Sequence, residues 1–267
     1  RAAASRAQRE AARRRAEEAK KGPPAASAEE SSWTASNGQE IQQAGRDTSR
    51  DFKLEVQKAV ETIPPNVAKR VQANGGRIVI GDTVTTIRPD LAGKRPRGWP
   101  EGHTWDEADG LYNPERKQVV ATERLLNPKT QTLDKSDRVG GVLRHEYGHA
   151  VDKATRGEGA TFHSEGEKFQ IAHNKDVVAL KKRQEVLRAL PDKERDAMAA
   201  RTEFWEIERM EYFHSQSGGV WASRQEAFAE GFAVLHGGGS VKGDEKVFTR
   251  LFPNTLAAIT DITKGIE

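Results

Sequence analysis

The feature that most restricts the fold is a pair of histidines, His145 and His149, with Glu146 directly after the first. On an α-helix, residues four apart lie on one face about 5–6 Å from each other, so one metal ion can reach both imidazoles. Zinc takes histidine nitrogens at about 2.0–2.1 Å, and the glutamate of this pattern takes a proton from water in metallopeptidases. The segment therefore predicts a helix that carries two zinc ligands and a general base.

Apolar residues on both sides of this motif favour a buried helix. Val139, Val142 and Leu143 precede it, and Ala150 and Val151 follow it. Together they form an apolar face that would bury the site against a sheet. The 267-residue chain has no cysteine, which excludes disulfide bonds and thiolate zinc sites, so histidine, aspartate and glutamate must hold any metal.

A second run offers the carboxylate that a site of two histidines and one glutamate needs. Glu226 and Glu230 lie four residues apart, among alanines and phenylalanines, within residues 224–233. A buried carboxylate is unfavourable without a partner, and a zinc ion is such a partner. The alternative is a pair of surface acids on an ordinary helix. Because the histidine motif is in the same chain, we favour metal ligation.

Composition describes a polar chain with one modest core. The chain is 35% hydrophobic and 31% charged, and its mean hydropathy is −0.78. No apolar stretch approaches the roughly 18 residues of a membrane-spanning helix, and the N-terminal residues lack the apolar centre of a secretory signal. A soluble chain is expected, either a processed product or a truncated one. Secretion and packaging in a virion are both compatible with it, and no oligomeric state is indicated.

The formal net charge of +3 is unevenly distributed. Residues 1–21 hold eight arginines and lysines against three glutamates, a net charge of +5, which leaves −2 for the rest. A linker rich in serine and alanine is expected over residues 22–48, so residues 1–48 would form a flexible basic tail before a folded domain over residues 49–267. The tail either binds nucleic acid or an acidic partner, or is a solvated piece of a longer helix.

Periodicity predicts an α+β domain that is mainly helical, with a small mixed sheet ahead of the zinc helix. Ahead of that helix we expect helices over residues 50–63 and 66–72 and strands over 77–81 and 84–87. A long loop over 89–109 and a hairpin over 110–121 would follow. From residue 137 on we expect helices over 137–155, 223–236 and 244–262. Between them, a charged insertion around residues 160–215, broken near Pro191, predicts a helical pair.

Two runs resemble a known family. Residues 144–152, Arg-His-Glu-Tyr-Gly-His-Ala-Val-Asp, and residues 226–233, Glu-Ala-Phe-Ala-Glu-Gly-Phe-Ala, resemble the catalytic domain of anthrax lethal factor and the related Pro-Pro endopeptidases. These are gluzincin metallopeptidases. The resemblance covers roughly residues 52–265 and is specific at the two runs. It implies a zincin-like fold, one zinc ion and hydrolysis of peptide bonds.

The resemblance also implies roles for acids near the histidines. Glu226 would be the third zinc ligand, and Glu230 would orient a ligand or the site water. Asp152 would support an imidazole, or would face solvent on the last turn of its helix. Tyr147 lies two positions from each histidine, so we expect it to point away from the metal and to pack in the core.

Substrate contacts are implied less completely. The resemblance implies an edge strand that binds the substrate backbone, and the candidates are Gly110, Leu111 and Tyr112. Family members place a tyrosine seven residues before the ligand glutamate, where it stabilises the oxyanion, but this chain has Gly219 there. Tyr212 lies upstream and is the candidate replacement. Without a replacement, turnover would be weak.

These patterns together predict a zinc-dependent endopeptidase acting on a protein or peptide substrate. His145, His149 and Glu226 would hold zinc, which activates water and polarises the scissile carbonyl, and Glu146 would pass the proton to the leaving amine. The alternative, motivated by Gly219, is a weak or inactive module of the same fold that serves as a structural or interaction component of a phage particle or toxin. The cleavage preference is not indicated.

Overall fold

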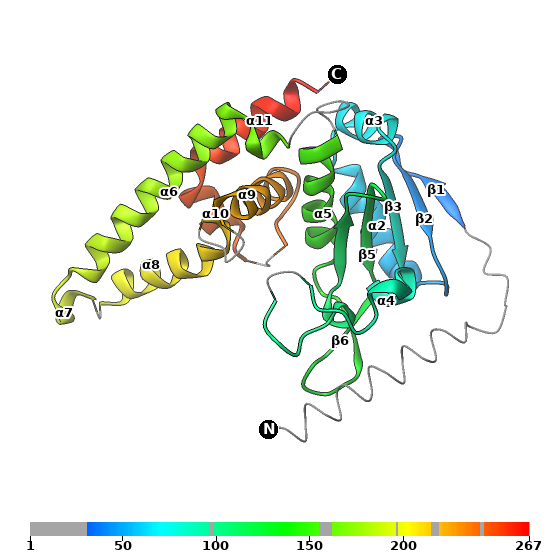
Figure 1. Ribbon diagram of the computed structural model, residues 1–267, viewed down its shortest axis with the longest axis horizontal. Helices are drawn as coiled ribbons and strands as arrows, with labels where there is room; N and C mark the ends of the chain where they lie inside the picture. Colours follow the sequence, from blue (N-terminus) through cyan, green and yellow to red (C-terminus); the bar gives the residue numbers. More distant parts are fainter. Residues whose placement is uncertain are drawn as a thin grey trace.

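A computed structural model describes residues 31–96, 99–154, 162–195, 197–214, 219–240 and 243–266. It shows an α+β fold with a small mixed sheet on one side and helices on the other (Figure 1), as the sequence predicts. The basic segment over residues 1–21, part of the expected tail, lies outside the described residues. Within the described ranges, no helix is both long and apolar enough to cross a membrane.

The main sheet has five strands in the order β1-β2-β3-β5-β4. Its strands are β1 (Ser32–Thr34), β2 (Glu40–Gln43), β3 (Arg77–Gly81), β5 (Gln118–Thr122) and β4 (Gly110–Asn113). Strands β2, β3 and β5 are parallel, and β1 and β4 lie antiparallel at the two edges. The predicted hairpin over residues 110–121 is confirmed, and β4 is an edge strand. A short hairpin, β6 (Arg124–Leu126) with β7 (Leu133–Lys135), follows.

Two expectations for the sheet region are wrong. The linker expected over residues 22–48 includes β1 and β2. Ile41 of β2 is fully buried in register with Ile78 of β3, but its other buried residue, Gln43, is polar, so no apolar alternation marks the strand. The strand expected over residues 84–87 is a helical turn, α4 (Val84–Ile87). Its β-branched composition resembles a strand, but Thr83 and Thr86 each bond the other's backbone N–H, at 3.2 and 2.9 Å, and close a capping box.

One face of the sheet is covered by helices α2 (Arg50–Glu61), α3 (Pro65–Ala73) and α5 (Val139–Ala154). Ser49 starts α2 by accepting a hydrogen bond from the Phe52 N–H at 3.3 Å. The apolar faces of these helices and the sheet share one core, which includes Phe52, Ile80 and Leu143. Helix α5, which carries the two histidines, therefore lies directly on the sheet and beside its edge strand β4.

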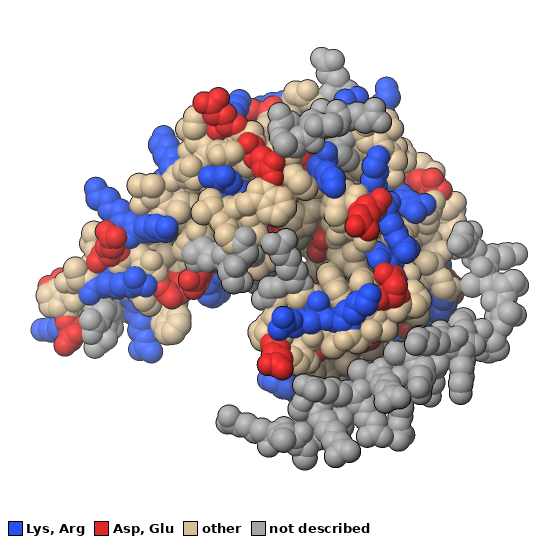
Figure 2. Space-filling model, in the orientation of Figure 1, with Lys and Arg blue, Asp and Glu red and all other residues tan. Residues whose placement is uncertain are grey.

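The C-terminal half is helical. Its helices are α6 (Glu167–Arg188), α7 (Asp192–Arg195), α8 (Met198–Arg209), α9 (Val220–Leu235), α10 (Glu245–Leu251) and α11 (Pro253–Lys264). Helix α9 packs along α5, and α11 packs on α6 and α9. Helices α6, α7 and α8, here called the arm, project from the body where the charged insertion predicts a helical pair (Figure 1). Figure 2 shows acidic and basic side chains intermixed over the arm.

Candidate metal centre

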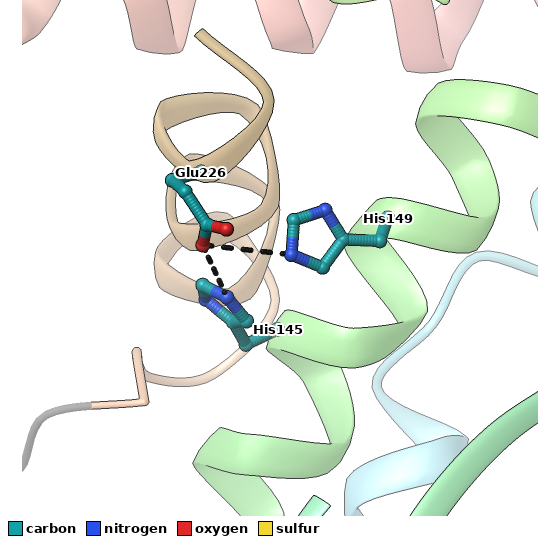
Figure 3. Close-up of side chains that lie close together, drawn as sticks. All are labelled: His145, His149 and Glu226. Carbon is teal, nitrogen blue, oxygen red and sulfur yellow. Dashed lines mark hydrogen bonds and ion pairs between the residues drawn. The ribbon is translucent and has the colours of Figure 1, made fainter. Parts of the chain in front are cut away.

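The candidate metal centre lies where α5 and α9 touch. His145 and His149 project from successive turns of α5, and Glu226 reaches toward them from α9 (Figure 3). The Nε2 atoms of His145 and His149 lie 3.2 and 3.6 Å from the same oxygen, Oε2 of Glu226. One ligand atom from each of the three residues lies within 4.8 Å of the others, an arrangement that could hold a metal ion.

Small residues allow this approach of the two helices. A Cβ atom on Gly148 would lie 2.7 Å from the Cα atom and 2.8 Å from the carbonyl oxygen of Ala229, so α5 and α9 meet backbone to backbone. At the start of α5, a Cβ on Gly141 would lie 2.1 Å from the carbonyl oxygen of Gly239. Any larger side chain at these positions would separate the histidines from Glu226.

Glu230, one turn after Glu226, is hydrogen-bonded to His145. The Nδ1 atom of His145 donates to Glu230 Oε2 at 2.8 Å, which leaves Nε2 facing Glu226. Ser240 donates its hydroxyl to the same carboxylate at 2.7 Å and its backbone N–H at 3.1 Å. Gly239 makes room for Glu230, because a Cβ there would lie 2.0 Å from Glu230 Oε1. The carboxylate is thus fixed from both sides.

Mutual attraction sets the charges of the three candidate ligands. Burial opposes ionisation of each, but the pKa of His145 is raised well above its ordinary value by Glu226 and Glu230. The pKa of His149 is raised by Glu226, also against the effect of burial. Burial would raise the pKa of Glu226, yet the two histidines lower it strongly. Glu226 is therefore ionised over the physiological range, as a metal ligand must be.

Glu146 lies beside this group and is partly buried. Burial raises the pKa of Glu146 most, the two histidines lower it, and the charges of Glu226 and Asp109 raise it further. A carboxylate with a raised pKa is suited to accept and return a proton near neutral pH. Its Cγ atom would lie 3.3 Å from a Cβ on Gly110, so the edge strand β4 passes directly beside it.

A cleft of about 580 Å³ opens over these residues. His145, Glu146, His149 and Glu226 all line it. Its walls are rich in aromatic side chains from the 89–109 loop, from β4 and from the helical half, namely Trp99, Trp105, Tyr112, Phe162, Tyr212 and Trp221. Gly110 and Leu111 line it as well, so the edge strand and the candidate metal ligands face one cavity.

The structure places the remaining predicted residues as follows. Tyr212 lies on the cleft wall with its side chain half exposed. Gly219 is the N-cap of α9, and a Cβ there would meet nothing within 4 Å. Tyr147 is fully buried, stacks on Phe232 and donates to Gln39 at 2.7 Å, which agrees with the expected packing role.

Asp152 is fully buried, so the solvent-facing alternative for this residue is wrong. Its carboxylate accepts hydrogen bonds from the backbone N–H and the hydroxyl of Ser164, each at 2.7 Å. Burial raises the pKa of Asp152 to about 7, against the lowering effects of Ser164 and His149. Its charge in turn helps to raise the pKa of Tyr112 to about 12, after the larger effect of burial on that tyrosine.

Two groups in the cleft are not singled out by the sequence patterns. Arg138 pairs with the buried Asp109 through two hydrogen bonds of 2.9 and 3.0 Å, and both line the cleft near Glu146. Gln225 precedes Glu226 and also lines the cleft, and its amide nitrogen is buried without a hydrogen-bond partner among the described residues. No motif marks these residues, since pairing and burial depend on segments distant in sequence.

The fold is similar to that of the Pro-Pro endopeptidase PPEP-2 from Paenibacillus alvei. The TM-score is 0.51, the sequence identity is 17%, and the match covers 83% of this chain and 96% of that one. At this identity the likeness is one of fold. At the level of sequence, no protein-family model and no curated protein matches the chain.

Proposed function

We propose that this chain is a zinc-dependent endopeptidase of the gluzincin type. The observation that carries the proposal is the convergence of His145, His149 and Glu226, with Glu146 beside them, in an open cleft. Contacts of 3.2 and 3.6 Å between the ligand atoms fit a zinc tetrahedron, whose edges are about 3.3 Å when its bonds are about 2.0–2.1 Å. The structural neighbour, a Pro-Pro endopeptidase by its name, supports a peptidase activity.

Each of the residues in the cleft would have a separate role in hydrolysis. When bound, zinc would polarise the scissile carbonyl and acidify water so that it reacts near neutral pH. Glu146, with its raised pKa, would accept the proton of that water and deliver it to the leaving nitrogen. Glu230 would keep the Nε2 atom of His145 directed at the metal. The unpaired edge of β4, at Gly110, Leu111 and Tyr112, would bind the substrate backbone by strand addition.

Stabilisation of the oxyanion falls to groups on the cleft wall. Tyr212 is the candidate carried by the sequence, and its position on that wall supports it. The amide of Gln225, next to Glu226, is buried and has no partner in the part of the chain that the structure describes, and it is a second donor in the same wall. A single donor of this kind contributes roughly 100- to 1000-fold to the rate.

The test is the substitution Glu146→Gln. This change keeps the size of the side chain and removes its basicity, so bound zinc should remain near one equivalent while cleavage of a broad peptide library falls by at least about 100-fold. Zinc is measured by elemental analysis and cleavage by mass spectrometry. Cleavage at the wild-type rate would overturn the mechanism.

A second candidate is a weak or inactive module of this fold, serving as a structural or interaction component of a phage particle or toxin. The supporting observation is Gly219, which has no side chain at the position where the resemblance implies a tyrosine, with open space around it. One equivalent of zinc without cleavage by the wild-type chain would favour this candidate.

A further inference from the structure

Helix α8 connects the tip of the arm to the cleft, and two of its faces are occupied. Toward α6, Ile207 is fully buried and Glu203 pairs with Arg183 at 2.6 Å. Toward α10, Glu206 pairs with Arg250. These contacts hold α8 along α6 at one side and against the body at the other, which leaves one face of the helix exposed.

The exposed face carries large apolar side chains in line with the cleft. Met198 is 82% exposed, and Trp205, seven residues later, is 58% exposed. Arg209 follows Trp205 by four positions and lines the cleft, as does Tyr212 in the next turn. Residues four and seven apart share a helix face, so Met198 and Trp205 continue the cleft wall outward along the arm.

The dimensions of the face suit an extended chain. At 1.5 Å of rise per residue, Trp205 lies about 6 Å and Met198 about 16 Å along α8 from Arg209 at the cleft rim. An extended polypeptide advances about 3.3 Å per residue, so the two side chains lie about two and about five residues beyond the cleft. Figure 2 shows the outline of the molecule notched between the arm and the rest of the body.

We propose that the exposed face of α8, formed by Met198 and Trp205, docks the flank of the polypeptide substrate that leaves the cleft. This inference rests on the proposed endopeptidase function and specifies its substrate class: unfolded or extended segments with apolar residues about two and about five positions outside the cleft. We choose the substrate flank as the occupant because the exposed face of α8 begins at residues that line the cleft. Tryptophan is enriched among the residues that contribute most to binding at protein interfaces.

The arm also supplies a matched control. Ile171 and Val178 on α6 are 62% and 65% exposed, spaced by seven residues, and neither lines the cleft. Replacing them with alanine removes a similar exposed apolar pair from the same arm without touching the α8 face. A general effect of arm hydrophobicity would affect both pairs, whereas docking along the cleft axis involves only Met198 and Trp205.

The experiment compares peptide libraries of about 9 and about 25 residues, because only the longer class can span both the cleft and the roughly 16 Å of α8 beyond it. For Trp205→Ala combined with Met198→Ala, we expect kcat/KM to fall about tenfold on long peptides, with no comparable fall on short ones. The control pair, Ile171→Ala with Val178→Ala, should match wild type on both classes. Mass spectrometry should also show apolar enrichment on one flank of long peptides cut by wild type, lost in the α8 double variant.

The outcomes separate this inference from the proposed function. Cleavage of both classes, with equal kcat/KM in wild type and the α8 double variant on long peptides, overturns the docking face and leaves the endopeptidase intact. A similar loss in the control pair also overturns it. If zinc-loaded wild type cleaves neither peptide class, the proposed endopeptidase function is overturned. In that case fluorescence anisotropy compares the binding of long peptides to wild type and to the α8 double variant. Equal affinity of the two proteins would overturn the docking face.

Discussion

The contact between α5 and α9 and the contact between α6 and α8 join helices in opposite ways. At the first, backbone meets backbone through Gly148 and Ala229, and the charged groups are buried and bonded to one another. At the second, side chains span the gap, and ion pairs such as Arg183 with Glu203 are partly exposed to water. The geometry of the candidate metal centre thus depends on the close approach of α5 and α9. The packing of α6 against α8 depends instead on several side-chain contacts that can each be replaced.

This difference has an energetic consequence. Removing one partner from a buried charged group leaves the other uncompensated, which costs several kcal/mol, whereas an exposed ion pair contributes at most about 1 kcal/mol. Single substitutions should therefore damage the α5–α9 contact and leave the arm nearly unchanged. The predictions below test that contrast in order of decreasing effect.

The largest effect is expected from Gly148→Ala. The new methyl group would lie 2.7 Å from the Ala229 backbone, so α9 must move away and carry Glu226 with it. We expect activity to fall about 100-fold, as for a displacement of about 1 Å in a catalytic group, with a loss of about 1–3 kcal/mol in the free energy of unfolding. Peptide cleavage and urea denaturation measure the two quantities.

Gly140→Ala is the control on the same helix. The nearest neighbours of its methyl group would be the Arg144 side chain at 3.4 Å and the Ala59 side chain at 3.5 Å, so it should be tolerated. Equal behaviour of the two variants would contradict the claim that α5 and α9 must touch at Gly148.

The next largest effect is expected from Glu230→Gln. An amide is a weaker acceptor for Nδ1 of His145 than a carboxylate, so the imidazole is less basic and less well oriented. Zinc affinity should fall by about 10- to 100-fold. Gly239→Ala should act in the same direction because its methyl group would displace Glu230. Competition with a fluorescent chelator gives the affinities, and unchanged values in both variants would refute the orienting role.

A smaller effect, dependent on pH, is expected from Asp152. Burial raises its pKa from 3.8 to about 7, so this group stabilises the fold fully below pH 3.8 and loses that contribution as the pH rises to about 7. In chelator-treated protein, the loss between about pH 5 and 7 should be on the order of 2 kcal/mol. Asp152→Asn should flatten this dependence in thermal denaturation, and an unchanged slope would assign the dependence to other groups.

The smallest effect is expected from Glu203→Gln on the arm. It removes the pair with Arg183, and both side chains are partly exposed, so the free energy of unfolding should fall by less than about 1 kcal/mol. Short-peptide activity should stay at the wild-type level. A loss as large as that of Gly148→Ala would erase the contrast between the two regions.

The sequence predicts the parts of this molecule that depend on local spacing. The histidines four residues apart, and Glu226 with Glu230 on a second helix, predict the residues that the structure brings together. The sequence is a poorer guide to polar segments whose secondary structure depends on pairing or capping rather than on an apolar pattern. Strands β1 and β2 have little apolar periodicity, and α4 is fixed by threonine capping rather than by propensity.

The cleft wall illustrates the same limit. Gln225 and the pair of Arg138 with Asp109 become candidates only when the loop, the sheet edge and two helices are assembled around one cavity. The contact of Gly148 with Ala229 is likewise invisible to a motif, because it depends on the approach of two helices some 80 residues apart in the chain.

Metal stoichiometry under native mass spectrometry tests the central claim most directly. Wild-type chain supplied with zinc should carry one ion, and His103→Ala, a histidine outside the cluster, should do the same. Glu226→Ala and His149→Ala should each lose the ion at the same zinc concentration, because two ligands do not hold zinc as three do. A wild-type chain without zinc, or one ion retained in both ligand variants, would contradict the account.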